Sequence, residues 1–126
     1  MKKIKILVVD DEEGIREFLV EYLNLNNFEV LLCSTLKEAI DINKQEKPPL
    51  ALIDIILPEE NGLVLYRELK KDNHDIKVVL MTGFPVEDIL EQAMKEGAVS
   101  YIFKPFELEN ILELLKKVST DLHNNQ

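Results

Sequence analysis

Short apolar runs alternate along the chain with longer stretches in which apolar residues recur at helical spacing. The runs are nearly continuous and rich in β-branched residues, a pattern typical of strands that are covered on both faces of a parallel sheet. We therefore predict five strands, over Ile4–Val9, Phe28–Cys33, Leu50–Ile53, Val78–Met81 and Tyr101–Phe103.

The stretches between these runs carry the pattern of amphipathic helices. Starting from Ile15, Val86 and Leu108, apolar residues recur at positions i, i+3, i+4 and i+7, which places them on one helix face. Thr35 and Glu38 have the spacing of a capping box, so they predict the start of the second helix.

Glycines mark two further helix ends, because Asn61-Gly62 turns the chain into the third helix and Gly97 closes the fourth. Strand and helix thus alternate five times with short connections. Right-handed crossovers make an open, doubly wound α/β sheet the expected fold. A closed eight-fold barrel would need about twice the length. We predict one domain over residues 1–122 and a polar tail over residues 123–126.

The composition fits one compact domain and limits its partners. The chain has 126 residues, of which 46% are hydrophobic and 31% are charged, so it is too apolar to be disordered. Its formal net charge is −9, and phosphate backbones and anionic membranes would repel such a surface. We therefore expect no direct binding to nucleic acid or to membranes.

Neither a membrane span nor a disulfide scaffold is expected. The apolar runs are far shorter than the roughly 18 residues of a spanning helix, and the first is too short for a signal peptide. The single cysteine, Cys33, has no partner for an internal disulfide, and we expect it to be a small buried hydrophobic residue. These features predict the cytoplasm as the location.

Residues whose side chains can bind ligands or take part in catalysis follow four of the predicted strands. Asp10 and Asp11 follow the first strand, and Asp54 follows the third. Thr82 follows the fourth strand and Lys104 the fifth. Because the carboxyl ends of parallel strands lie at one edge of a sheet, where ligands bind, we expect these side chains to converge.

Each of these residues has an ordinary explanation when it is considered alone. The acids after the first strand suit a helix N-terminus, Asp54 could cap a loop, and Lys104 could be a surface lysine. Their joint occurrence at one edge favours a functional cluster.

The chemistry of such a cluster is that of a divalent cation and a phosphoryl group. Carboxylates a few ångströms apart repel each other unless a cation offsets them. Oxygen ligands without His or Cys favour Mg²⁺, or Mn²⁺, over zinc. One carboxylate can then attack phosphorus and form an acyl phosphate, while a lysine and a hydroxyl bind the phosphoryl oxygens.

Several segments then carry a resemblance to a known family. They are Ile6–Glu12, Leu52–Pro58 with Gly62, Met81–Gly83, and Gly97-Ala98 with Tyr101–Phe106. In this order they resemble the receiver domain of two-component response regulators, over residues 4–118. The resemblance implies a flavodoxin-like (βα)5 fold with a five-stranded parallel sheet in the strand order 2-1-3-4-5.

The resemblance also implies roles for the acids. Asp54 would be the phosphoacceptor, taking a phosphoryl group from a histidine kinase or a phosphotransfer protein. Asp10 and Asp11 would hold Mg²⁺, Asp11 directly, and Asp54 and the backbone carbonyl of Ile56 would complete the protein ligands. The chain would catalyse only its own phosphorylation and dephosphorylation, so it would not be an enzyme acting on other substrates.

The remaining implied roles concern switching. Thr82 and Lys104 would bind the phosphoryl group, and the Lys104-Pro105 peptide bond is usually cis in this family. Movement of the Thr82 hydroxyl toward the phosphoryl group would draw the Tyr101 ring inward and change the face made by the fourth helix, fifth strand and fifth helix. Tyr101 could also be an ordinary half-buried strand aromatic.

Partner contacts are predicted around the same edge. Ile15 belongs to a helical apolar stripe, which favours a core position, but receivers often expose an apolar residue there for kinase docking. Pro105 and Phe106 would lie on the same rim. The output would be a downstream protein target or a fused domain, and the similarity around Asp10–Arg16 slightly favours a stand-alone phosphorelay receiver. A monomer is expected, with a dimer through the fourth helix, fifth strand and fifth helix as the alternative.

Three other functions compete with this interpretation. A metal-dependent phosphatase with an Asp nucleophile would need a second Asp two residues later, where the chain has Ile56. A flavodoxin-like flavin binder would need a phosphate-binding loop after the first strand, where the chain has acids. A receiver that is never phosphorylated, acting as a scaffold, would not need the full set of site residues.

The apolar side chains of Ile56 and Phe84, two residues after Asp54 and Thr82, predict slow hydrolysis of the acyl phosphate.

Overall fold

The computed structural model describes residues 2–57, 61–84 and 86–124, with the side chains of residues 13–16 and 121–124 outside the description. Within these residues five strands alternate with five helices, as the hydrophobic pattern predicts. The elements are β1 (Ile4–Val9), α1 (Glu13–Asn24), β2 (Phe28–Cys33), α2 (Leu36–Glu46), β3 (Leu50–Asp54), α3 (Gly62–Asp72), β4 (Lys77–Thr82), α4 (Glu87–Lys95), β5 (Ser100–Phe103) and α5 (Leu108–Asn124).

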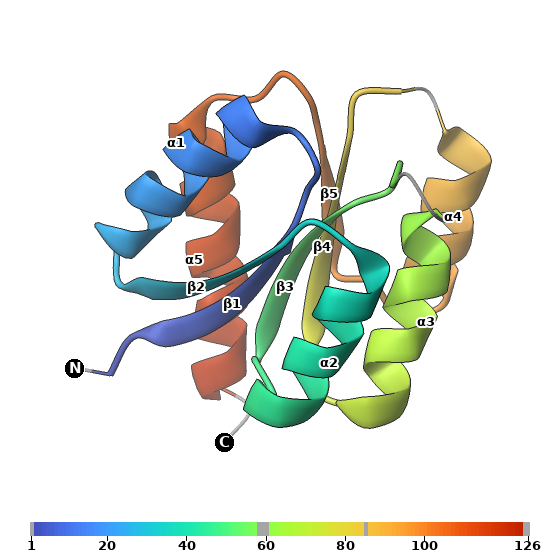
Figure 1. The fold of residues 1–126 in the computed structure, drawn as a ribbon, viewed down its shortest axis with the longest axis horizontal. Helices are drawn as coiled ribbons and strands as arrows, with labels where there is room; N and C mark the ends of the chain where they lie inside the picture. The colour runs from blue at the N-terminus through green and yellow to red at the C-terminus, as the bar shows by residue number, and fades with distance from the viewer. Residues whose placement is uncertain (1, 58–60, 85, 125–126) are drawn as a thin grey trace.

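The strands form one parallel sheet in the order β2-β1-β3-β4-β5. Helices α1 and α5 cover one face, and α2, α3 and α4 cover the other (Figure 1). The predicted doubly wound α/β fold and its strand order are therefore confirmed. Every crossover returns the chain to the same end of the sheet, so the strands deliver their last residues to a common edge.

Alternating residues of the central strands supply two hydrophobic cores. Leu7 and Val9 of β1 pack toward α2, α3 and α4, while Ile6 and Val8 pack toward α1 and α5. These four side chains have no exposed surface. Burial of each contributes about 1.5–3 kcal/mol, which fixes the strands and therefore the positions of their ends.

Two predicted helix ends are formed as the local sequence suggests. The Thr35 side chain accepts a hydrogen bond from the Glu38 N–H at the start of α2. After α4 the chain turns at Gly97, whose φ of +112° is one that side-chain-bearing residues rarely adopt. The Gly97 N–H then donates to the Met94 carbonyl and the Ala98 N–H to the Ala93 carbonyl, a Schellman motif.

The carboxyl-terminal helix is longer than the predicted domain boundary suggests. Helix α5 runs to Asn124, so it includes the first two residues of the segment predicted as a tail. Residues 125–126, like Pro58 of the second segment of the family resemblance, lie outside the described residues. None of the described helices is both long and apolar enough to cross a membrane.

Candidate phosphoacceptor site

Asp10 and Asp54 lie side by side at the carboxyl edge of the sheet. Asp54 ends β3, and Asp10 follows directly after β1, the neighbouring strand. Asp10 is fully buried and Asp54 is 4% exposed. In both residues Oδ1 accepts a hydrogen bond from the backbone N–H two residues later. The Glu12 N–H donates to Asp10 at 2.9 Å, and the Ile56 N–H donates to Asp54 at 2.9 Å. This shared turn aligns the two carboxylates and leaves their Oδ2 atoms for other partners.

Lys104 donates hydrogen bonds to the Oδ2 atoms of both aspartates. Its Nζ donates to Asp10 Oδ2 at 2.9 Å and to Asp54 Oδ2 at 2.7 Å. It also donates to Glu12 Oε1 at 3.0 Å. The lysine side chain is only 8% exposed, so its ammonium group is a buried positive charge among three carboxylates. The peptide bond from Lys104 to Pro105 is cis, as the family resemblance implies.

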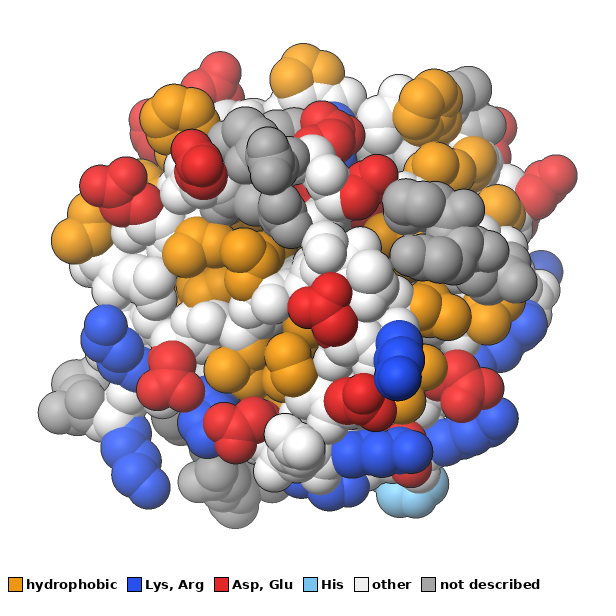
Figure 2. Space-filling view, in the orientation of Figure 1, with side chains coloured by type: hydrophobic (Ala, Val, Ile, Leu, Met, Phe, Trp, Pro, Cys, Tyr) orange, Lys and Arg blue, Asp and Glu red, His pale blue; other side chains and the backbone are white. Residues whose placement is uncertain are grey.

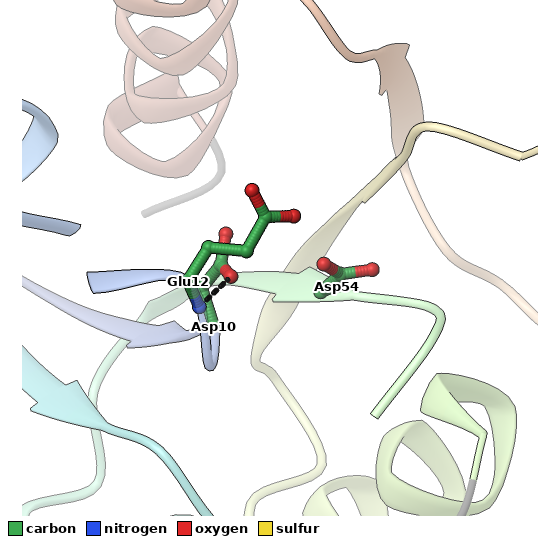
Figure 3. Close-up of side chains that lie close together, drawn as sticks. All are labelled: Asp10, Glu12 and Asp54. Carbon is green, nitrogen blue, oxygen red and sulfur yellow. Dashed lines mark hydrogen bonds between the residues drawn. The ribbon is translucent and has the colours of Figure 1, made fainter. Parts of the chain in front are cut away.

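Glu12 is the site residue that sequence reasoning missed. One carboxylate oxygen each from Asp10, Glu12 and Asp54 lie within 4.8 Å of one another. Figure 3 shows these carboxyl groups and the hydrogen bond from the Glu12 N–H to Asp10. The turn that Asp10 makes brings the residue two positions later back over the site. The spacing of Asp10 and Glu12 was the available indication, since an Asp so often makes this turn.

The site holds its charges against the cost of burial. Burial raises the pKa of the Asp54 carboxyl, and the hydrogen bonds from Lys104 and the Ile56 N–H only partly offset this increase. Burial alone would lower the pKa of the Lys104 ammonium, but the hydrogen bonds to Asp54, Asp10 and Glu12 outweigh it and raise that pKa. Lys104 is therefore protonated at neutral pH and counterbalances the carboxylates.

The other predicted ligands lie around this cluster. Asp11 is exposed and is not in the group formed by Asp10, Glu12 and Asp54. It lines an open pocket of about 390 Å³ that also reaches Asp54. Ile56 and Phe84, which are 38% and 60% exposed, line the same pocket. Asp11 therefore shares this pocket with Asp54.

Thr82 is the last residue of β4 and is fully buried. Its Oγ1 accepts a hydrogen bond from the Phe84 N–H at 3.1 Å, so the hydroxyl is engaged by the turn that leads into α4. Tyr101 lies on β5 and is 43% exposed. Its ring packs edge-on against the ring of Phe103, with the two ring centroids 5.5 Å apart. The structure thus places the Tyr101 ring on the surface, away from the core clusters.

The predicted docking residues differ in exposure. Pro105 is exposed, whereas Phe106 is half-buried and packs against the core beneath α1 and α5. The side chain of Ile15 lies outside the described residues. Cys33 is 1% exposed, and burial raises its thiol pKa to about 12, in keeping with the predicted buried hydrophobic role.

The donor set fits a divalent cation. The carboxylates of Asp10, Glu12 and Asp54 and the ammonium of Lys104 leave an excess of two negative charges, three minus one. All the acidic donors are oxygens, which suits Mg²⁺. In Figure 2 basic side chains lie mostly in the lower half of this face, whereas acidic ones are spread over both halves.

Comparison with known proteins gives the family of this fold and site. Residues 6–116 match the model of the response regulator receiver domain. Sporulation initiation phosphotransferase F of Bacillus subtilis (strain 168) is 32% identical over 117 residues, which cover 93% of this chain and 94% of that protein. The chain spans only 50–53% of the length of several other curated relatives.

Solved structures agree with this assignment. A CheY-like receiver domain protein from Methanospirillum hungatei JF-1 superposes with a TM-score of 0.95 at 27% identity, covering 99% of this chain and 100% of that one. A response regulator protein from Burkholderia pseudomallei, with a phosphorylated aspartic acid, a calcium ion and citrate, superposes with a TM-score of 0.83 at 27% identity. The superposition covers 98% of this chain and 72% of that one.

The class is that of doubly wound α/β domains with an acid cluster and a buried lysine at the carboxyl edge of the sheet. Within it, the chain belongs to the response regulator receiver domain family of two-component signal transduction. Receiver domains of this family are phosphorylated on an aspartate, generally use Mg²⁺, and interact with histidine kinases or phosphotransfer proteins and with output domains.

Proposed function

We propose that Asp54 accepts a phosphoryl group from a phosphohistidine of a histidine kinase or phosphotransfer protein. The observation that carries this proposal is the geometry of Asp54: a nearly buried carboxylate at the end of β3, with Oδ1 held by a backbone N–H and Oδ2 held by Lys104. A carboxylate oxygen attacks phosphorus as the N–P bond of the donor breaks. The products are an acyl phosphate on Asp54 and a free imidazole on the donor.

Mg²⁺ would be held by Asp10, Asp11, Asp54 and the backbone carbonyl of Ile56. Asp10 and Asp54 are adjacent, and Asp11 lines the pocket above them, which supports this set. A divalent cation neutralises the charge that accumulates on the phosphoryl oxygens during transfer. Glu12, which lies among these acids, has no part in the ligand set that the family resemblance implies.

Lys104 and Thr82 would bind the phosphoryl group once it is attached. The Lys104 ammonium already lies against Asp54 Oδ2, so it can pair with a phosphoryl oxygen at that position with little movement. To donate to a phosphoryl oxygen, the Thr82 hydroxyl would give up its 3.4 Å hydrogen bond to the Phe84 carbonyl, while Oγ1 can still accept from the Phe84 N–H. Positioning and charge neutralisation are most of what phosphoryl transfer requires.

The loss of the hydrogen bond from the Thr82 hydroxyl to the Phe84 carbonyl would connect the site to a switch. The turn from Thr82 to Phe84 leads into α4, and the N-cap residue of that helix, Val86, makes no side-chain capping hydrogen bond. The exposed ring of Tyr101 would move inward, changing the face made by α4, β5 and α5. Structures with and without beryllium fluoride test this step, since an unchanged Tyr101 ring and α4 would contradict it.

Partners and location follow from the same proposal. Phe106 and Pro105 would contribute to docking of the phosphodonor, together with Ile15. A downstream protein or a fused output domain would recognise the switched face. The relative of similar length supports the first arrangement, and the relatives about twice as long support the second. We expect a monomer that acts in the cytoplasm and catalyses only its own phosphorylation and dephosphorylation.

The competing phosphatase function is not favoured. An Asp-nucleophile phosphatase needs an acid two residues after the nucleophile, and Ile56 at that position offers an apolar side chain to the pocket.

Intact mass measurement tests the proposal. The protein is incubated with Mg²⁺ and a small acyl phosphate or phosphoramidate donor. The wild type should gain one phosphoryl group, and Asp54→Ala should gain none. Equal phosphorylation of both proteins, or of neither, would contradict the proposal.

A further inference from the structure

Lys104 has one partner more than the proposed phosphoacceptor role requires. Besides the buried carboxylates of Asp10 and Asp54, its Nζ donates to Glu12 Oε1 at 3.0 Å. The Glu12 side chain is 55% exposed, so it approaches the ammonium from the solvent side of the cluster. None of the residue roles in the proposed function uses this carboxylate.

The arrangement makes Lys104 a competitor of any cation that binds the two buried acids. Asp10 and Asp54 each commit Oδ1 to a backbone N–H, and Lys104 occupies Oδ2 of both. A divalent cation that takes these Oδ2 atoms must therefore displace the ammonium. The Glu12 carboxylate, by contrast, has no backbone partner among the described hydrogen bonds and can keep Lys104 while the other two contacts are lost.

We propose that Glu12 is a positioning residue that holds the Lys104 ammonium beside Asp54 while a divalent cation occupies the buried carboxylates. The inference rests on the proposed function, since it assigns a step of cation binding at that same site. Glu12 acts through Lys104 and is not itself a ligand of the cation.

The physical reason is the cost of leaving a buried ammonium without a partner. With Glu12 present, Lys104 moves from three carboxylates to one as the cation enters. Without Glu12, the displaced ammonium would lose both of its remaining partners, so it would stay on Asp10 and Asp54 and oppose the cation. Because Glu12 is half-exposed and its pair with Lys104 is partly screened, we expect a change of about two- to fivefold in cation affinity.

Titration calorimetry with MgCl₂ tests the proposal through a double-mutant cycle. The proteins are the wild type, Glu12→Gln, Lys104→Met and the double variant. We expect Glu12→Gln to weaken Mg²⁺ binding in the chain that retains Lys104. In the Lys104→Met background the same substitution should have no effect, because there is no ammonium left to hold.

The control and the contrary outcomes are equally specific. Glu17→Gln removes the same charge from an exposed position on α1 and should leave Mg²⁺ binding unchanged. An equal loss from Glu12→Gln in both backgrounds would overturn the proposal, since Glu12 would then act on the cation by its own charge. No loss, or tighter binding, would overturn it as well.

Two further measurements keep the test decisive. Thermal unfolding establishes that each variant is folded, and Lys104→Gln replaces Lys104→Met if the latter does not fold. Absence of Mg²⁺ binding by the wild type would also overturn the proposal. Phosphorylation of Asp54 is scored separately by intact mass, so a wild type that is phosphorylated while Glu12→Gln binds Mg²⁺ normally leaves the proposed function intact and removes only the role of Glu12.

Discussion

Lys104 and Asp54, 50 residues apart in the chain, meet at 2.7 Å between Nζ and Oδ2 at the carboxyl edge of the sheet. Strands β3 and β5 bring them together from either side of β4. The contact lowers the pKa of the Asp54 carboxyl and so partly offsets burial, which raises it. A site of this kind is held together at some cost to stability, because its charges are arranged for a ligand.

Replacement of Asp54 by Asn should therefore stabilise the fold. Since burial raises the pKa of this carboxyl, its charged form is less stable in the folded chain than in water, and a neutral amide avoids that penalty. Lys104 would retain Asp10 and Glu12 as partners. We expect the free energy of unfolding in urea to rise by about 0.5–1 kcal/mol at pH 7 without added metal.

Asp41→Asn is the matched control for this prediction, because Asp41 is exposed on α2 and lies outside the acid cluster. It should change the free energy of unfolding by less than about 0.5 kcal/mol. A loss of stability in Asp54→Asn that is absent from the control would show that the carboxylate stabilises the resting fold.

The side chain of Ile56 should prolong the life of the acyl phosphate. It is 38% exposed and lines the pocket that also reaches Asp54, so it restricts the approach of water. We expect Ile56→Asn to accelerate dephosphorylation several-fold, measured as the decay of phosphoprotein after removal of the donor. An unchanged or slower decay would contradict this role of Ile56.

Gly62 positions the segment that follows Asp54. Its N–H donates to the Ile55 carbonyl at 2.6 Å, and an added Cβ would lie 2.7 Å from the Ile55 Cα and 2.8 Å from the Asp54 carbonyl oxygen. Gly62→Ala should therefore cost about 1–3 kcal/mol in the free energy of unfolding, because backbone atoms must move.

Gly83→Ala provides the comparison for that substitution. A Cβ at Gly83 would make an ordinary contact at 3.6 Å, with the Lys104 Cβ. Its effect on urea unfolding should be clearly smaller than that of Gly62→Ala. If the two substitutions lowered the free energy of unfolding equally, the close approach of backbone atoms at Gly62 would not explain the effect of a side chain at that position.

Much of the site could be predicted because it depends on where strands end. Asp10, Asp54, Thr82 and Lys104 were identified from their positions after apolar runs, and the sheet does bring their strands to one edge. The details of strand ends were less accessible. Asp54 and Thr82 are the last residues of their strands rather than the first residues after them, since sheet pairing continues through Asp54 with Met81 and through Thr82 with Phe103.

What could not be predicted depends on side-chain geometry. The contact of Glu12 with Lys104 requires the turn at Asp10 and the reach of a lysine from β5, neither of which leaves a periodic pattern in the sequence. The hydrogen bond between the Phe84 N–H and the Thr82 hydroxyl is equally local. The exposure of Tyr101 depends on its place in an edge strand, which the hydrophobic pattern does not specify.

Arg67 and Glu96 should make the stability depend on pH. Arg67 donates to both oxygens of Glu96, at 2.8 and 2.6 Å, and these bonds, with one from Gln92, lower the pKa of Glu96 from its ordinary 4.5 to about 2. A carboxyl whose pKa is lower in the folded chain stabilises the fold above its unfolded pKa. That contribution is lost as the pH falls toward the folded value.

The urea midpoint of the wild type and of Glu96→Gln, followed from about pH 7 to about pH 3, checks this dependence. The wild type should be the more stable at neutral pH, and its advantage should shrink below about pH 4.5. Glu91→Gln, at an exposed position of α4, should show no such convergence. A constant difference between wild type and Glu96→Gln over the whole range would exclude the ion pair as its cause.

The most direct test of the account asks which side chain carries the phosphoryl group. Protein phosphorylated in the presence of Mg²⁺ is treated with borohydride, which reduces an acyl phosphate of aspartate to homoserine, and the peptides are sequenced by mass spectrometry. We predict homoserine at position 54, and none when the metal is chelated before the donor is added. Homoserine at Asp10 or Asp11, or a phosphoryl group on a residue outside the site, would contradict the account.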